Sequence, residues 1–209
     1  MTAARAGDRG QAFPIYIVMV AGLLFAALAF FVVGMAGVKR SDAQGAADSA
    51  ALAAARESRD RLFAGLDLLT LKPADWEAIL RGDRLDGRDG CGRAVEFAAL
   101  NGASAACSAS GAEFTVNATT NSGLGKSVVP GTEGTRGTAA ATAVIEPHCT
   151  LGSAATPAPT PEPTSSPGPV AEPALVELRC SGEVISVDPL KPGSLVRLAR
   201  MLFTVRLID

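Results

Sequence analysis

The stretch that decides the fold is Ile15–Val38, which reads IYIVMVAGLLFAALAFFVVGMAGV. Its 24 residues are apolar or small, and its only ionisable group is the phenol of Tyr16. As a helix that rises about 1.5 Å per residue, it spans roughly 36 Å, enough to cross a hydrocarbon core of about 30 Å. Cleaved secretory signals usually have a shorter apolar region followed by small residues, whereas Lys39 and Arg40 follow this one. The stretch therefore predicts a transmembrane helix.

The charges that flank this helix leave its orientation nearly undecided. Arg5 and Arg9 precede it, and Lys39 and Arg40 follow it, so the positive-inside rule is almost tied. The tail before the helix is only 14 residues long, and all four cysteines lie after the helix. An even number of cysteines is typical of disulfides in an oxidising compartment. We therefore expect a single-pass protein of the cell membrane, with a cytoplasmic N-terminus and an extracytoplasmic head.

Composition limits the rest of the chain to one modest domain or two small ones. The protein has 209 residues, a net charge of −2 and an aromatic content of 5%. No basic patch with interleaved aromatic residues is present, which makes nucleic acid a poor candidate partner. Membrane lipid is the partner that the apolar stretch itself predicts.

Alanines continue the helical pattern beyond the membrane segment, and they predict one nearly continuous helix from about Pro14 to Leu69. Gly45 and Gly65 are candidate bends in this helix. Small side chains let helix backbones approach closely, so we expect the membrane-proximal alanines to pack against other helices. The alternative is that they dock on the chain's own globular part. Leu62–Leu69 is expected to dock on the chain's own head. The packing stripe consists of Ala43, Ala47, Ala50, Ala51 and Ala54.

The remaining pattern predicts an α+β head with an antiparallel sheet. Short helices are expected from Lys72 to Gly82 and from Arg93 to Leu100, with a glycine-rich loop from Gly82 to Gly92 between them. A proline-rich segment, 157–173, is expected to be an extended linker. Alternating apolar residues predict strands at Glu113–Thr119, Thr138–Ile145, Ala174–Arg179, Glu183–Val187 and Met201–Ile208.

Four cysteines, Cys91, Cys107, Cys149 and Cys180, allow three disulfide connectivities. The favoured one joins Cys149 to Cys180 across the linker and Cys91 to Cys107 across the second short helix. It would return the last strands to the sheet that contains Thr138–Ile145 and make the linker an insertion in one head. The predicted organisation is a tail (1–14), a transmembrane helix (15–38), a helical stalk (39–70), a first part of the head (71–150), a linker (151–174) and C-terminal strands (175–209).

Motifs that carry chemistry are weak in this chain. Gly125-Lys126-Ser127 resembles the end of a phosphate-binding loop, but Thr120 stands where that motif requires glycine. His148 is the only histidine, and the cysteines lack the close spacing of zinc ligands. The carboxylates Asp75, Glu77, Asp83, Asp86 and Asp89 lie in a region of alternating charge without a constrained acid–base pair. We therefore expect no enzyme activity, no cofactor and no catalytic or metal site.

The N-terminal third resembles a known family. Asp8-Arg9-Gly10-Gln11-Ala12-Phe13-Pro14, the apolar helix and the segment Arg40–Ala55, with its Ala-Gln-Gly-Ala-Ala-Asp-Ser-Ala-Ala-Leu-Ala run, are similar to TadE/TadG-like proteins of Tad (Flp) pilus loci, particularly those of actinobacteria. The resemblance covers roughly residues 8–60. It implies a minor pilin or pseudopilin whose apolar helix anchors the subunit and can pack into the helical core of a pilus. Other Tad proteins, including TadE-like pseudopilins and the inner-membrane platform, are the partners it implies.

One position departs from the pattern of processed pilins. These are cut after a glycine and carry glutamate at the fifth mature position. If the candidate processing site were Gly10–Gln11, Ile15 would occupy that position. The glutamate is thought to pair with a neighbouring amino terminus inside the apolar filament core, where a lone charge is costly. Its absence favours an unprocessed, TadG-like assembly factor over a subunit at the filament tip.

The sequence therefore predicts a non-enzymatic, membrane-anchored component of Tad pilus assembly. The alternative is a membrane-tethered extracellular binding module of the cell envelope that is unrelated to pili.

Overall fold

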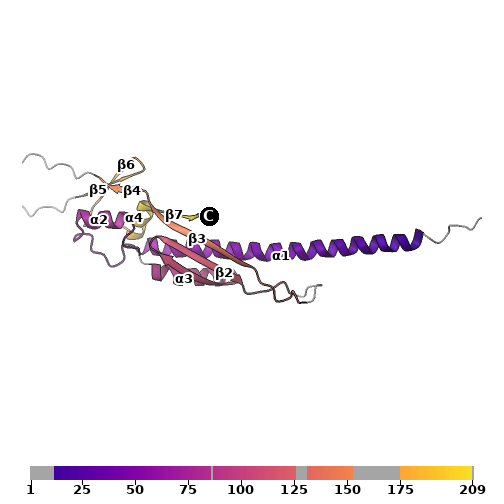
Figure 1. Cartoon of the computed structure of the whole chain (residues 1–209). Coiled ribbons are helices and arrows are strands. Elements are labelled where there is room, and N and C mark those ends of the chain that lie inside the picture. Colours follow the sequence, from indigo (N-terminus) through magenta and orange to yellow (C-terminus); the bar gives the residue numbers. More distant parts are fainter. Residues whose placement is uncertain (1–11, 86, 126–130, 153–174, 209) are drawn as a thin grey trace, which may run out of the picture.

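The computed structural model describes residues 12–85, 87–125, 131–152 and 175–208, and within these ranges it forms an α+β fold with one long projecting helix (Figure 1). The predicted fold class is confirmed. The helices are α1 (Ala12–Asp60), α2 (Pro73–Leu80), α3 (Gly87–Leu100) and α4 (Leu195–Leu202). The strands are β1 (Ala103–Ser110), β2 (Glu113–Thr120), β3 (Thr138–Pro147), β4 (Cys149–Leu151), β5 (Val176–Cys180), β6 (Glu183–Val187) and β7 (Phe203–Ile208).

Helix α1 runs without interruption for 49 residues, about 74 Å at 1.5 Å per residue. Its first half projects away from the head, and its second half lies along the sheet (Figure 1). The helix passes through Gly45 without interruption and ends at Asp60, so the prediction of helix up to Leu69 is wrong. The chain turns after Asp60, and Phe63 in this turn is fully buried, with its ring centroid 6.1 Å from that of Trp76.

The main sheet has four strands in the order β1-β2-β3-β7, and every neighbouring pair is antiparallel. Along β2, Phe114, Val116 and Ala118 are buried and alternate with more exposed residues, as the sequence predicted. Helices α1 and α3 pack against each other and against the sheet, α1 on β2 and β3 and α3 on β1. The head is thus a two-layer structure, and the second half of α1 is one of its layers.

Cys149–Leu151, Val176–Cys180 and Glu183–Val187 form a second, three-stranded antiparallel sheet in the order β4-β5-β6. The expectation that the last strands rejoin the main sheet is right for β7, which pairs with β3. It is wrong for β5 and β6. Strand β5 pairs instead with β4, which follows β3 directly in the chain, while β7 occupies the edge of β3.

Three further elements differ from the predictions. Strand β1 was not predicted, because its sequence, ASAACSAS, has no β-branched or aromatic residue; it forms because it pairs along its whole length with β2. Helix α3 begins at Gly87, inside the expected Gly82–Gly92 loop. Helix α4 precedes β7, so the expected strand from Met201 begins only at Phe203.

One buried cluster joins the predicted stalk to the predicted head. It includes alanines from Ala46 to Ala55 of α1 together with side chains of α2, α3, the sheets and α4. The stalk of residues 39–70 is therefore part of the core rather than a spacer. The tail up to residue 11 and most of the predicted linker, 153–174, lie outside the described residues.

Candidate functional site

The first half of α1 presents an uncovered apolar surface. Phe25 and Phe30 are 76% and 77% exposed, and the most apolar stretch of the helix makes no buried contact within the described structure. By length and composition, this helix can cross a membrane. An apolar surface of this size marks a site of contact with lipid or with other proteins. The helix therefore fits a membrane anchor, and its apolar surface is uncovered in the described structure.

The alanine stripe has a different role from the one expected. Its five members, Ala43, Ala47, Ala50, Ala51 and Ala54, have no exposed surface at all. They are covered by the chain's own α3 and main sheet. The expectation that this stripe packs against helices of other subunits is therefore wrong, because the surface is already occupied.

The small side chains allow α1 and α3 to lie unusually close together. A Cβ atom placed on Gly90 of α3 would lie 2.6 Å from the carbonyl oxygen of Ala54 and 2.7 Å from Cε1 of Phe114. Backbone contact of this kind requires glycine on one helix and alanine on the other. The stripe is thus explained by packing within the head.

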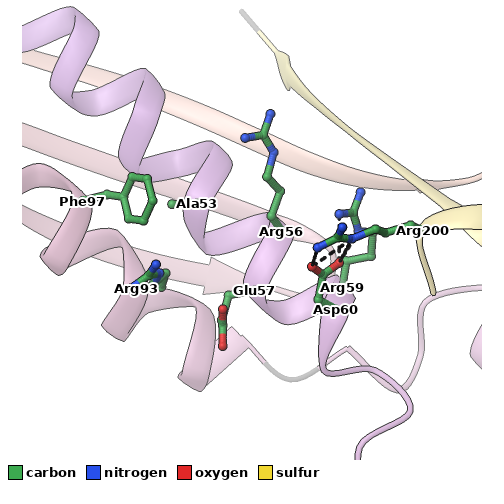
Figure 2. Close-up of a pocket in the computed structure, with 8 residues that line it drawn as sticks. All are labelled: Ala53, Arg56, Glu57, Arg59, Asp60, Arg93, Phe97 and Arg200. Carbon is green, nitrogen blue, oxygen red and sulfur yellow. Dashed lines mark hydrogen bonds and ion pairs between the residues drawn. The ribbon is translucent and has the colours of Figure 1, made fainter. Parts of the chain in front are cut away.

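An ionic cluster ties the end of α1 to α4, far away in the sequence. Arg200 donates to Asp60 with an Nη2–Oδ2 distance of 2.6 Å, and Arg59 donates with an Nη2–Oδ1 distance of 2.9 Å (Figure 2). Burial alone raises the pKa of the Asp60 carboxyl, but the hydrogen bonds from Arg200 and Arg59 outweigh it and hold that pKa below its ordinary value. This cluster was not predicted, because nothing local in the sequence relates Asp60 to a residue as distant as Arg200.

A pocket of about 420 Å³ lies beside this cluster, between α1 and α3. It is lined by charged side chains of both signs, with Ala53 and the ring of Phe97 as its apolar part (Figure 2). The Arg93 guanidinium lies 4.7 Å from the centroid of that ring. Guanidinium groups stay protonated at physiological pH, and a carboxylate of lowered pKa is a weak base. The arrangement is suited to holding elements together or to binding charged groups, and it contains no nucleophile paired with a base.

The residues considered for chemistry in the sequence do not converge. His148 is half-buried between β3 and β4, with a buried Nδ1 that has no hydrogen-bond partner in the structure. Asp75 and Asp83 form ion pairs at the surface, with Arg84 and Arg81. Among the described residues, no three His, Cys, Asp or Glu side chains come together as metal ligands would. Lys126, Ser127 and Asp86 lie outside the described residues, as does the side chain of Asp89.

Both favoured disulfides are present. Cys91 of α3 is bonded to Cys107 of β1, and Cys149 of β4 to Cys180 of β5, its direct cross-strand neighbour. The first bond holds α3 on the edge of the main sheet, and the second closes the 31-residue separation that contains the predicted linker. The candidate processing site, Gly10–Gln11, lies outside the described residues.

Comparison with known proteins gives one finding. Residues 10–57 match the family model described as "Putative Flp pilus-assembly TadE/G-like". No curated protein and no solved structure matches the chain. The matched segment is most of α1, including both the uncovered apolar half and the buried alanine stripe, and it confirms that the N-terminal part of the chain is TadE/TadG-like.

Proposed function

We propose that this protein is a non-enzymatic component of Tad pilus assembly, a TadG-like pseudopilin or minor pilin that stays anchored in the membrane. The observation that carries the proposal is the TadE/G-like match over residues 10–57, which falls on the helix that links an apolar span to the head. A role in Tad pilus assembly follows from the match; the more specific role is the proposal.

The division of α1 supports an assembly role. The alanine face of its second half is buried in the core of its own head, so the large uncovered apolar surface available to helices of neighbouring subunits is that of the first half. Phe31 is 64% exposed on this half, and Val33 is 71% exposed. In a bilayer, such a surface can exchange lipid contacts for helix contacts at little cost, because lipid chains are as apolar as the side chains.

The proposal includes an unprocessed N-terminus. Ile15, where a processed pilin would carry glutamate, lies in the first turns of α1 and is 64% exposed. An isoleucine there offers no charge for a neighbouring amino terminus, so the subunit lacks the pairing that would favour burial in a filament core. The N-terminus is proposed to lie in the cytoplasm and the disulfide-bonded head outside.

Cysteine crosslinking in cells that make the pilus tests this function. The full-length protein carries a single added cysteine at Phe31, on the uncovered half of α1, or at Ala47, in the buried stripe. Crosslinks to TadE-like proteins or to the assembly platform are expected from Phe31→Cys and not from Ala47→Cys. Val184→Cys, on an exposed strand of the second sheet, reports contacts of the head alone.

Three outcomes would count against the proposal. If the Phe31→Cys variant gives only uncrosslinked monomer in cells that assemble pili, the uncovered half of α1 contacts lipid alone. Normal pilus production in a deletion strain would favour the envelope binding module instead. Intact mass spectrometry tests the processing claim, because a mature chain starting at Gln11 would refute it.

A further inference from the structure

A second pocket, of about 400 Å³, lies where the apolar span of α1 meets the head. One wall is α1, with Ala36, Lys39 and Arg40, and the other is the β2–β3 connection, with Leu124, Arg136 and Gly137. In Figure 1 the described parts of this connection, 121–125 and 131–137, extend from the sheet along α1 towards its projecting half.

With α1 placed across a bilayer, the pocket would lie at the depth where hydrocarbon gives way to headgroups. Ala36 belongs to the apolar span, and Lys39 is the first charged residue after it. Positions 36, 39 and 40 share one face of the helix, because residues three and four apart are neighbours. The same face continues into the buried alanines at 43 and 47, so the pocket lies at the end of this face nearest the apolar span.

The walls of this pocket are held in place by the backbone. A Cβ atom on Gly137 would collide with the carbonyl oxygen of Lys39, so the two backbones are in direct contact. Thr120 donates its N–H to the carbonyl of Gly137 at 2.9 Å and accepts the Gly137 N–H on its hydroxyl at 3.0 Å. The Lys39 ammonium donates to the hydroxyl of Ser122 at 3.0 Å. The described parts of the connection, 121–125 and 131–137, are therefore held against α1 without a ligand.

Two cationic side chains in the pocket have no ion-pair partner among the described residues. Lys39 already pairs with Asp42 at 3.8 Å, whereas Arg40 and Arg136 are exposed and form no ion pair with any described residue. They stand on opposite walls of the pocket, one on α1 and one on the connection. Guanidinium groups bind phosphate oxygens through two parallel hydrogen bonds, and Ala36 and Leu124 supply an apolar side for an acyl chain.

From this arrangement we propose that the pocket binds the phosphate headgroup of an anionic phospholipid in the leaflet next to the head. Arg40 and Arg136 contact the phosphate, and the acyl chains lie along the uncovered face of α1 below Ala36. The lipid thereby seats the head on the membrane surface. The inference requires that α1 crosses the bilayer and does not depend on the role in pilus assembly.

Lipid retention by the full-length protein tests the inference. The protein is reconstituted into nanodiscs with equal amounts of phosphatidylglycerol and phosphatidylcholine, and the lipids it keeps are counted by native mass spectrometry. Each basic residue near an anionic surface strengthens binding about fivefold. The wild type is expected to keep phosphatidylglycerol in preference by more than tenfold, and the Arg40→Gln/Arg136→Gln double variant to keep the two lipids about equally.

Matched controls separate the pocket from general charge. Arg179→Gln/Arg197→Gln removes two exposed arginines of the second sheet and α4, and it is expected to leave the preference unchanged. Arg136→Lys keeps the charge and is expected to keep most of the preference. Near-UV circular dichroism confirms that each variant is folded, and equal incorporation into nanodiscs confirms that α1 inserts.

Three results would overturn the inference. The first is equal retention of both lipids by the wild type. The second is the same loss in the Arg179→Gln/Arg197→Gln control as in the pocket variant. The third is displacement of phosphatidylglycerol by millimolar inorganic phosphate, which would identify a site for free phosphate rather than for lipid.

Discussion

Two glycines of α3, Gly90 and Gly92, offer the sharpest test of how the head packs. Added to Gly92, a Cβ atom meets nothing within 4 Å, so Gly92→Ala only gains helix propensity, about 1 kcal/mol. Added to Gly90, the same atom lies 2.6 Å from the carbonyl oxygen of Ala54 and 2.7 Å from Phe114. Ordinary contact begins near 3.4 Å, so α1 or α3 must move by about 0.8 Å.

The expected magnitudes follow from these distances. Overpacking of a well-packed core costs about 1–3 kcal/mol, and the contact at Gly90 includes backbone that cannot rotate away, which places it at the upper end of that range. After the gain in propensity, Gly90→Ala is expected to lower the free energy of unfolding by about 1–2 kcal/mol. For a domain of this size, 1 kcal/mol corresponds to roughly 2–4 °C in Tm.

Thermal unfolding of the two full-length variants in the same detergent measures the difference. The fluorescence of Trp76, the only tryptophan, is a probe of the core because this side chain is 2% exposed. A rise in Tm for Gly92→Ala and a fall for Gly90→Ala are expected. Equal shifts in the same direction would refute the close contact between α1 and α3.

Three further changes test other parts of the structure. Ala47→Leu adds three carbons at a fully buried position and is expected to destabilise the head by about 1–3 kcal/mol in thermal unfolding, whereas Ala99→Leu, at an exposed position of α3, is expected to be neutral. The folded-state pKa of Asp60 is lowered. The stability that its ionised carboxylate contributes is therefore fully present above the ordinary pKa and is lost as the pH falls through the lowered pKa. Arg200→Gln is therefore expected to lower stability only slightly near neutral pH and to flatten the acid limb of a pH–stability curve; an unchanged acid limb would show that the ion pair is not formed. Cys180→Ser removes the disulfide between β4 and β5 and is expected to lower the free energy of unfolding by about 2–4 kcal/mol in chemical denaturation. An unchanged denaturation midpoint would contradict this.

The elements predicted correctly from the sequence are those with a strong local signal. The apolar span consists of apolar and small residues throughout. In β2, buried apolar residues such as Phe114 and Val116 alternate with more exposed ones. The disulfide pairing was favoured because the position of two cysteines on either side of the linker restricts how the chain can return. Helix α4 had a signal that was not used, since Ser194 caps it and Leu195, Leu198 and Leu202 recur at spacings of three and four.

The sequence does not reveal which segment or subunit each surface contacts. Alanines at helical spacing predict close packing, but an alanine stripe that contacts a neighbouring subunit has the same sequence as one that contacts α3. The candidate sites were missed for a related reason. Asp60 meets Arg200, and Arg40 shares a pocket with Arg136, only because the fold brings distant segments together.

The central claim is that α1 has two parts, a membrane-embedded half and a half that forms the core of the head, with the boundary at Val38–Lys39. A spin-label scan along positions 18–44 of the full-length protein in a bilayer measures this most directly. Labels at Phe25 and Phe31 are expected to be accessible to oxygen and shielded from a water-soluble nickel complex, and labels at Ser41 and Gln44 to show the reverse. Access of the nickel complex to Phe25 and Phe31 would contradict the claim, because the exposed apolar half of α1 would then not lie in lipid.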